Sequence, residues 1–93
     1  MFMHLTIHHP QPGAETAVID SMHRFGAALA GAPGLISVHT MQDADAGVLA
    51  GLAIWSSQEA MEASIHLARD AVANDPFDEW ESRVVEGYRL TDV

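Results

Sequence analysis

The chain has 93 residues, 48% of them hydrophobic, with 13 acidic residues against four arginines and no lysine. This length predicts a single domain over residues 1–93, and the apolar content excludes a disordered chain. The net charge of −9 excludes nucleic acids and anionic membrane surfaces as favoured partners, because both are bound through clustered basic residues. The absence of cysteine excludes disulfides, a thiolate nucleophile and Fe–S or zinc-knuckle sites.

The chain carries no recognisable targeting or membrane segment. Its first residues, "MFMHLTIHHP", lack the basic region and long apolar run of a signal peptide. No apolar stretch reaches the length of a membrane span. A cytoplasmic location is therefore expected.

Hydrophobic periodicity predicts a strand, a helix and then two further strands. Residues 2–9, "FMHLTIHH", alternate between apolar and polar side chains as a half-buried strand does. Residues 14–30 place apolar side chains at i, i+4, i+7 and i+11, which is typical of an amphipathic helix. Residues 35–41 and 48–55 are predicted as strands, and the polar turn between them favours a hairpin.

A second helix and a last strand follow the hairpin. Ser56 and Glu59 fit a capping box, in which the serine hydroxyl caps the helix and the glutamate reaches back. The helix ends at residues 74–76, "NDP", and "PFDEW" then opens a short turn. Residues 82–93 form the last strand. The order β-α-β-β-α-β predicts an α+β, ferredoxin-like fold with a four-stranded antiparallel sheet.

Alternation along the strands divides their residues into two faces. One face is almost entirely apolar and comprises Met3, Leu5, Ile7, Ile36, Val38, Val48, Ala50, Leu52 and Ile54. The other mixes small, polar and aromatic groups and comprises His4, Thr6, His8, Ser37, His39, Met41, Leu49, Gly51, Ala53 and Trp55. Periodicity alone leaves open which face the helices cover. If the apolar face is the bare one, a second subunit must cover it.

The expected strand order, 4-1-3-2, makes the first and third strands neighbours. We expect this pair to run parallel, which would bring His8 close to Trp55. His4 and His8 share a face, but four strand residues separate them by about 13 Å. They cannot chelate one metal together, and no metal site is predicted.

The chain resembles the antibiotic biosynthesis monooxygenase (ABM) family over nearly its whole length. The resemblance lies in the order of elements, the Pro-Gly after the first strand and the junction "WSSQEAMEA". That junction is typically a tryptophan, a serine two residues on and Glu-Ala shortly after, here Trp55, Ser57, Glu59 and Ala60. The resemblance implies a dimeric α+β barrel, in which two sheets pack face to face and each subunit holds a cavity between sheet and helices.

This arrangement implies where the two sets of strand residues lie. The homodimer interface would then be formed by Leu5, Ile7, Val38, Leu52 and Ile54. The substrate pocket would be lined by His4, Thr6, Gly51 and Trp55.

The best-understood branch of the family oxidises polyketide phenols to quinones with O₂, and it needs neither metal nor flavin. The resemblance therefore implies a cofactor-free monooxygenase that acts on a small aromatic ligand. The substrate phenolate itself is the electron donor in that branch, and the protein supplies a dry pocket and a base.

The sequence departs from the catalytic sets of both branches that were compared. Gly51 stands where the quinone-forming branch has asparagine, and Met61 where its tyrosine is expected. In a haem-degrading branch, an asparagine and a tryptophan occupy the positions of Thr6 and Ser64. A non-catalytic ligand-binding or accessory dimer is thus the alternative function, with haem binding or degradation as a third.

The base is predicted to be His8 first and His39 second. For each, the alternative is a hydrogen-bonded or half-exposed histidine without a chemical role. Trp55 is expected both to close the core and to form one side of the cavity. Tyr88 and Arg89 point in opposite directions, and the sequence does not choose which of them faces the cavity.

Overall fold

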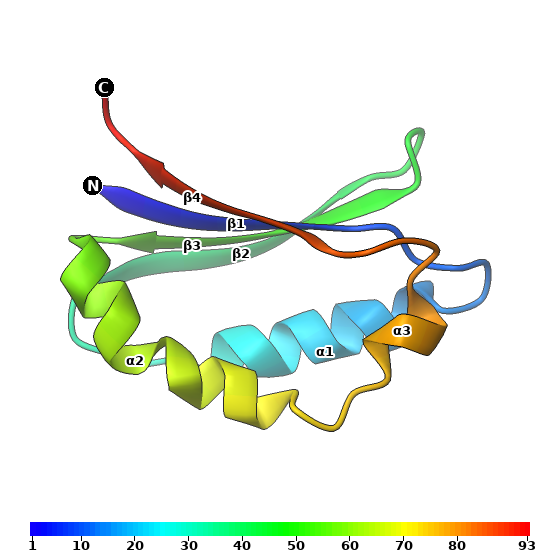
Figure 1. The fold of residues 1–93 in the computed structure, drawn as a ribbon, viewed down its shortest axis with the longest axis horizontal. Coiled ribbons are helices and arrows are strands. Elements are labelled where there is room, and N and C mark those ends of the chain that lie inside the picture. The colour runs from blue at the N-terminus through cyan, green and yellow to red at the C-terminus, as the bar shows by residue number, and fades with distance from the viewer.

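The computed structural model describes all residues 1–93 and has the predicted order of elements (Figure 1). The elements are β1 (Phe2–His8), α1 (Glu15–Ala28), β2 (Leu35–Asp43), β3 (Val48–Trp55), α2 (Gln58–Ala71), α3 (Phe77–Trp80) and β4 (Glu86–Thr91). The predicted ferredoxin-like fold is confirmed. The last strand is shorter than the predicted 82–93, and the short turn at "PFDEW" is α3.

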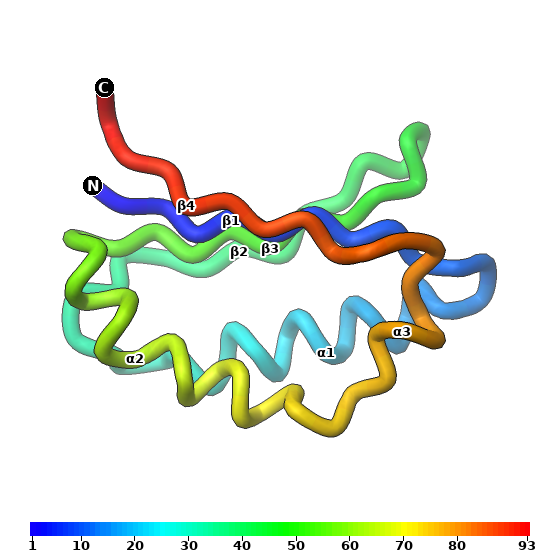
Figure 2. The backbone as a smooth tube through the Cα atoms, viewed as in Figure 1, coloured from blue at the N-terminus to red at the C-terminus, as the bar shows by residue number.

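The molecule has two layers, a four-stranded sheet and a layer of helices on one side of it (Figures 1 and 2). The strand order is β2-β3-β1-β4, and all three pairings are antiparallel. The overall dimensions are 36 × 30 × 17 Å. Only 14 of the 93 residues are fully buried, because the outer face of the sheet has no layer above it.

The core lies between the sheet and the helices, in two groups. The larger comprises Phe2, Leu29, Ala53, Trp55, Met61, Ile65 and Ala68. The smaller comprises Val18, Met22 and Leu49. None of the helices is long and apolar enough to cross a membrane.

The direction of β3 differs from the prediction. β1 and β3 are antiparallel, so that Phe2 lies opposite Trp55 and His8 lies opposite Leu49. The expected parallel pair is wrong because α1 returns the chain and β2 then runs in the direction of β1. The hairpin from β2 to β3 reverses that direction once more. His8 and Trp55 therefore lie at opposite ends of the sheet.

A register irregularity between Leu35 and Ser37 reverses the alternation of β2. Such a bulge moves every later side chain to the other face. Val38 lies opposite Ala53 and faces α1, where a Cβ on Gly26 would come within 2.9 Å of its Cγ1. The faces predicted for strand residues after the bulge are therefore wrong, and Val38 does not belong to the outer surface.

The N-terminus of α2 begins one residue later than predicted. Ser57, not Ser56, is the N-cap, and its Oγ accepts a hydrogen bond from the Ala60 backbone N–H at 3.1 Å. The Ser56 N–H instead donates to the Gly34 carbonyl at 2.8 Å. With Ser57 as the cap, the residue at the reciprocal position is Ala60, which has no side-chain acceptor. The predicted capping box from Ser56 to Glu59 is therefore wrong.

Ser57→Ala should lower the free energy of unfolding by about 1 kcal/mol, because it leaves a first-turn backbone N–H without its acceptor. Ser56→Ala is the matched control and should have a clearly smaller effect. Urea denaturation of both variants measures the difference. Equal losses from the two substitutions would contradict the assignment of Ser57 as the cap.

Candidate functional site

A cavity of about 280 Å³ lies between the sheet and α1. This volume is close to the lower end of small-ligand sites, which is roughly 300 Å³. Polar groups line it from β1 and β2, and most of the rest of its wall is apolar. The apolar side chains are Met22, Phe25, Val38, Val72, Phe77 and Val85. The lining suits a small, largely apolar ligand.

Gly51 on β3 forms part of the cavity floor. A Cβ at this position would lie 2.9 Å from Thr6 Oγ1 and 3.3 Å from Met22 Cε. The first distance is too short for a real contact, so a larger residue requires Thr6 to move. The asparagine of the quinone-forming branch could not enter here without that rearrangement.

The segment after α2 closes one end of the cavity, with Val72 and Phe77 in its wall. Asp75 in this segment accepts hydrogen bonds from Ser21 Oγ and from Arg24 Nη2, both on α1. The Ser21 hydroxyl holds the pKa of Asp75 below its usual value, and Arg24 adds to the effect. These bonds fasten the closing segment to α1.

His8 is the buried polar residue at the closed end of the cavity. Its Nδ1 lies 2.7 Å from Glu81 Oε1, and the two residues are 7% and 6% exposed. The His8 ring also lies against Phe77, with the ring centroids 6.0 Å apart.

Backbone hydrogen bonds fix Glu81 beneath the end of β1. Its own N–H donates to the Phe77 carbonyl at 2.9 Å, and the Ser82 N–H donates to the His9 carbonyl at 2.7 Å. An isolated β-bridge joins Pro10 and Glu81. The end of β1 and the residues after α3 are thereby held together as a rigid pair of segments.

The Glu81 carboxylate favours one tautomer of His8. Glu81 Oε2 is buried and has no hydrogen-bond partner, so His8 is the carboxylate's only side-chain donor apparent in the structure. A buried carboxylate without a donor is strongly unfavourable, which favours the proton on Nδ1. In the neutral form of the imidazole the lone pair is then on Nε2, and this atom makes no hydrogen bond with the protein. This is the arrangement of a histidine base oriented by a carboxylate.

His4 lines the cavity on the same face of β1, toward the end of the strand near Trp55. Burial lowers the pKa of His4 below its usual value of 6.5, and the charges of Arg69 and Arg89 lower it further. The imidazole is therefore neutral at pH 7. Arg89 lies opposite His4 in the pairing of β1 with β4, so Arg89 faces the helices and Tyr88 faces outward.

The structure brings some of the predicted site residues together and separates others. His4, Thr6, His8 and Gly51 all line the cavity. Trp55 does not line it, because the antiparallel pairing places its side chain, 0% exposed, in the larger core group. The prediction that Trp55 forms a cavity wall is therefore wrong.

His39, the second predicted base, has its side chain on the outer face of the sheet. It lies opposite Leu52 in the pairing of β2 with β3, and its Nε2 is 3.0 Å from Ser37 Oγ on the same face. His39 borders the cavity through the strand backbone, because its side chain points the other way. The face predicted for His39 is wrong, and the bulge in β2 is the reason.

The outer face of the sheet is a continuous apolar surface. Its centre holds the predicted interface residues Leu5, Ile7, Leu52 and Ile54. Met41 from β2 and Tyr88 and Leu90 from β4 extend it, with exposed fractions of 56%, 45% and 43%. The helices cover none of these side chains.

Nothing in the sequence points to Glu81 as a functional residue. It follows a short helix whose acidic residues resemble a solvated face, and its partner His8 is 73 positions away. The only available signal is the pair of aromatic residues Phe77 and Trp80, which stack edge to face at 5.7 Å. They show that this segment packs inward.

The protein is a ferredoxin-like α+β domain with two layers, a cavity beneath its sheet and an apolar outer face. Residues 1–74 match the family described as antibiotic biosynthesis monooxygenase, and the chain belongs to this ABM family. The matched residues include His8 but end before Glu81. No curated protein matches the sequence.

Solved structures share this fold at low sequence identity. Rv0793 from Mycobacterium tuberculosis is 18% identical, with a TM-score of 0.83 over 99% of this chain and 94% of that one. A Nitrosomonas europaea protein provisionally described as an antibiotic biosynthesis monooxygenase is 14% identical, with a TM-score of 0.76 over 100% and 99% of the two chains. A Chloroflexus aurantiacus protein with the same provisional description is 21% identical, with a TM-score of 0.71 over 99% and 92%. At these identities the likeness shows the fold alone.

The lowered pKa of His4 predicts a pH dependence of stability. Below pH 6.5 the unfolded chain takes up a proton at His4 that the folded chain does not yet bind. The unfolded state is then favoured, so the free energy of unfolding decreases as the pH falls from 6.5 toward the folded pKa. His4→Gln should remove this part of the pH dependence.

Urea denaturation at fixed protein concentration, above and below pH 6.5, compares the free energy of unfolding of the wild type with that of His4→Gln. NMR follows the His4 imidazole directly. A His4 resonance that titrates above 6.5 would contradict the assignment.

Proposed function

We propose that this protein is a cofactor-independent monooxygenase of the ABM type, which oxidises a small aromatic, polyketide-like phenol with O₂ inside the cavity. The observation that carries the proposal is the buried hydrogen bond between His8 and Glu81 at the wall of a largely apolar cavity. A histidine whose Nδ1 is held by a carboxylate and whose Nε2 has no protein partner is a suitable base for a phenol. Membership of the ABM family supports the same reaction class.

The first step is proton transfer from the substrate to His8. Nε2 accepts the phenolic proton, and the imidazolium that forms is stabilised by Glu81, 2.7 Å from its Nδ1. The cavity excludes water from the resulting anion, which makes the anion a better electron donor. Phe77 holds the imidazole in place from the side.

The second step transfers electrons from the substrate anion to O₂. With an anthrone-type substrate, one electron passes from the enolate to O₂, and the carbon radical and superoxide combine into a C–O bond. The peroxide takes back the proton from His8. The remaining hydrogen of that carbon and the distal hydroxide then leave as water, so one oxygen atom stays in the quinone carbonyl. The substrate loses four electrons, and O₂ accepts them.

The apolar outer face supports a homodimer as the active form. Leu5 and Leu52 lie opposite each other at its centre, and Tyr88 continues it onto β4. Monomers rarely leave so large a contiguous apolar surface in water. We propose that two subunits pack these faces together, which leaves each cavity on the helix side of its own sheet.

Gly51 and Trp55 favour a second candidate function, a ligand-binding or accessory dimer without catalysis. The position of Gly51 carries no asparagine to hold a substrate anion, and Trp55 lies in the core. In this case the cavity binds an aromatic compound and releases it unchanged. Oxygen consumption separates the two functions.

Oxygen uptake with dihydroxynaphthalene and anthrone-type substrates should persist in the presence of EDTA and without added flavin or NAD(P)H. His8→Asn should lower kcat by about 10²–10⁴-fold, the usual contribution of a general base. The asparagine Nδ2 keeps the donor to Glu81 but supplies no second nitrogen. His66→Asn, on the exposed side of α2, is the matched control and should keep full activity.

Glu81→Gln should lower kcat more than it raises KM, because Glu81 contacts His8 and not the substrate. Full turnover by His8→Asn would show that the base is elsewhere. Tight binding of these compounds without oxygen uptake would instead establish the ligand-binding function.

Leu52→Asp should dissociate the dimer, because it would bury a charge without a partner in the subunit interface. Leu67→Asp, at a 47% exposed position on α2, is the matched control and should leave the dimer intact. Light scattering at micromolar concentration measures both. A wild-type protein that is monomeric under these conditions would refute the interface.

A further inference from the structure

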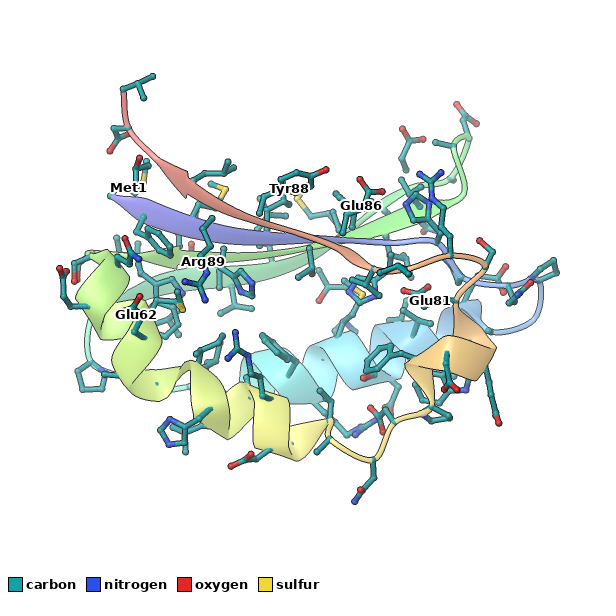
Figure 3. The ribbon with its side chains drawn as sticks, viewed as in Figure 1. Met1, Glu62, Glu81, Glu86, Tyr88 and Arg89 are labelled. Atoms are coloured by element: carbon teal, nitrogen blue, oxygen red, sulfur yellow. The ribbon has the colours of Figure 1, made fainter.

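Two of the four arginines, Arg69 and Arg89, lie near His4, which lines the cavity; neither arginine is itself part of the lining. Arg89 pairs with His4 across β1 and β4, and Figure 3 shows it on the helix side of the sheet, between β4 and α2. Its Nη1 is 3.8 Å from Glu62 Oε1 on α2. Arg69 follows Glu62 by two helical turns and so lies on the same side of α2, which faces β4. His4 is only partly buried, so the cavity reaches solvent at this point.

These two arginines differ from the other two in making no hydrogen bond to the protein. Arg24 is held by Asp20 and Asp75 on the far side of α1, and Arg83 is bonded to Glu86. Arg69 has no ion pair, and the 3.8 Å distance of Arg89 from Glu62 is longer than a hydrogen bond. Guanidinium groups with free donors bind carboxylates, often with two parallel hydrogen bonds.

Arg69 and Arg89 stand out because the rest of the chain is strongly acidic. With a net charge of −9, most of the surface repels anions. Both arginines lie close enough to His4 for their charges to act on its imidazole. Two guanidinium charges near His4, in an otherwise acidic protein, favour ligands with a negative group.

We propose that Arg69 and Arg89 form an anion-selecting entrance to the cavity, and that its ligand is an aromatic compound with a carboxylate at the end away from His8. The proposal rests on the proposed function for the placement of the reacting ring at His8. His4 and His8 are about 13 Å apart along β1, a span that suits an elongated fused-ring ligand. Thr6 lies between the two ends and the neutral His4 lies at the arginine end, and both offer hydrogen bonds.

Two probes that cannot be oxidised at a phenol test the entrance separately from the reaction. Calorimetry compares the dissociation constants of 2-naphthoate and 2-naphthamide, which differ only in charge at one end. NMR shifts of the Thr6 and Gly51 amides confirm that the cavity is occupied. The wild type should bind the carboxylate more tightly, and added salt should reduce the preference. Arg69→Gln and Arg89→Gln should each lower the preference by about two- to fivefold.

Arg83→Gln is the control, because it removes the same charge near Val85, at the end of the cavity away from His4, and should leave the preference unchanged. Equal binding of the two probes would overturn the proposal, as would an equal loss in the Arg83 variant or an absence of shifts in the cavity amides. An arginine-dependent preference in a protein that takes up no oxygen would support the entrance and reject the monooxygenase. Oxygen uptake without an arginine-dependent preference would support the monooxygenase and reject the entrance.

Discussion

The alternation of side chains along β1 decides the character of both faces of this molecule. β1 is hydrogen-bonded to β3 on one side and to β4 on the other. The strand therefore cannot rotate to exchange its inward and outward side chains without breaking these hydrogen bonds. In most two-layer domains the apolar set of a strand faces the helices. Here His4, Thr6 and His8 face the helices, and the apolar residues between them face outward. A small domain tolerates this arrangement because the inward polar groups line a cavity and His8 has a buried partner.

The larger core group and the proposed reacting group, His8, lie at opposite ends of the space between sheet and helices. Trp55 and Phe2 anchor the larger core group at one end, where α2 begins. At the other end, the segment after α2 carries Phe77 and Glu81 to the end of β1. The packed core occupies one end of this space, and the cavity with His8 in its wall occupies the other. The division follows from the antiparallel direction of β3, which separates Trp55 from His8.

Positive charge is scarce in this chain, and each arginine has a distinct place. Arg24 fastens the closing segment of the cavity through Asp75, and Arg83 neutralises Glu86 at the edge of the sheet. The remaining two flank His4. Burial keeps His4 neutral, and the two arginine charges add to the effect. In the proposed entrance the same two charges favour an anion beside His4.

The sequence by itself determined the order of the elements, the ferredoxin-like fold, and the two unlike faces of β1 and β3. These follow from local periodicity, which the chain carries in consecutive residues. Only the tertiary structure decided the reversal of β2 after Leu35 and the partner of His8, whereas the direction of β3 already follows from the order of the elements. The hydrophobic pattern of the sequence does not reveal the extra residue of a bulge. Val38 therefore faces the helices and His39 faces outward, the opposite of what the alternation predicts. Glu81 meets His8 across 73 positions, and no local pattern records a contact that forms only when distant segments pack.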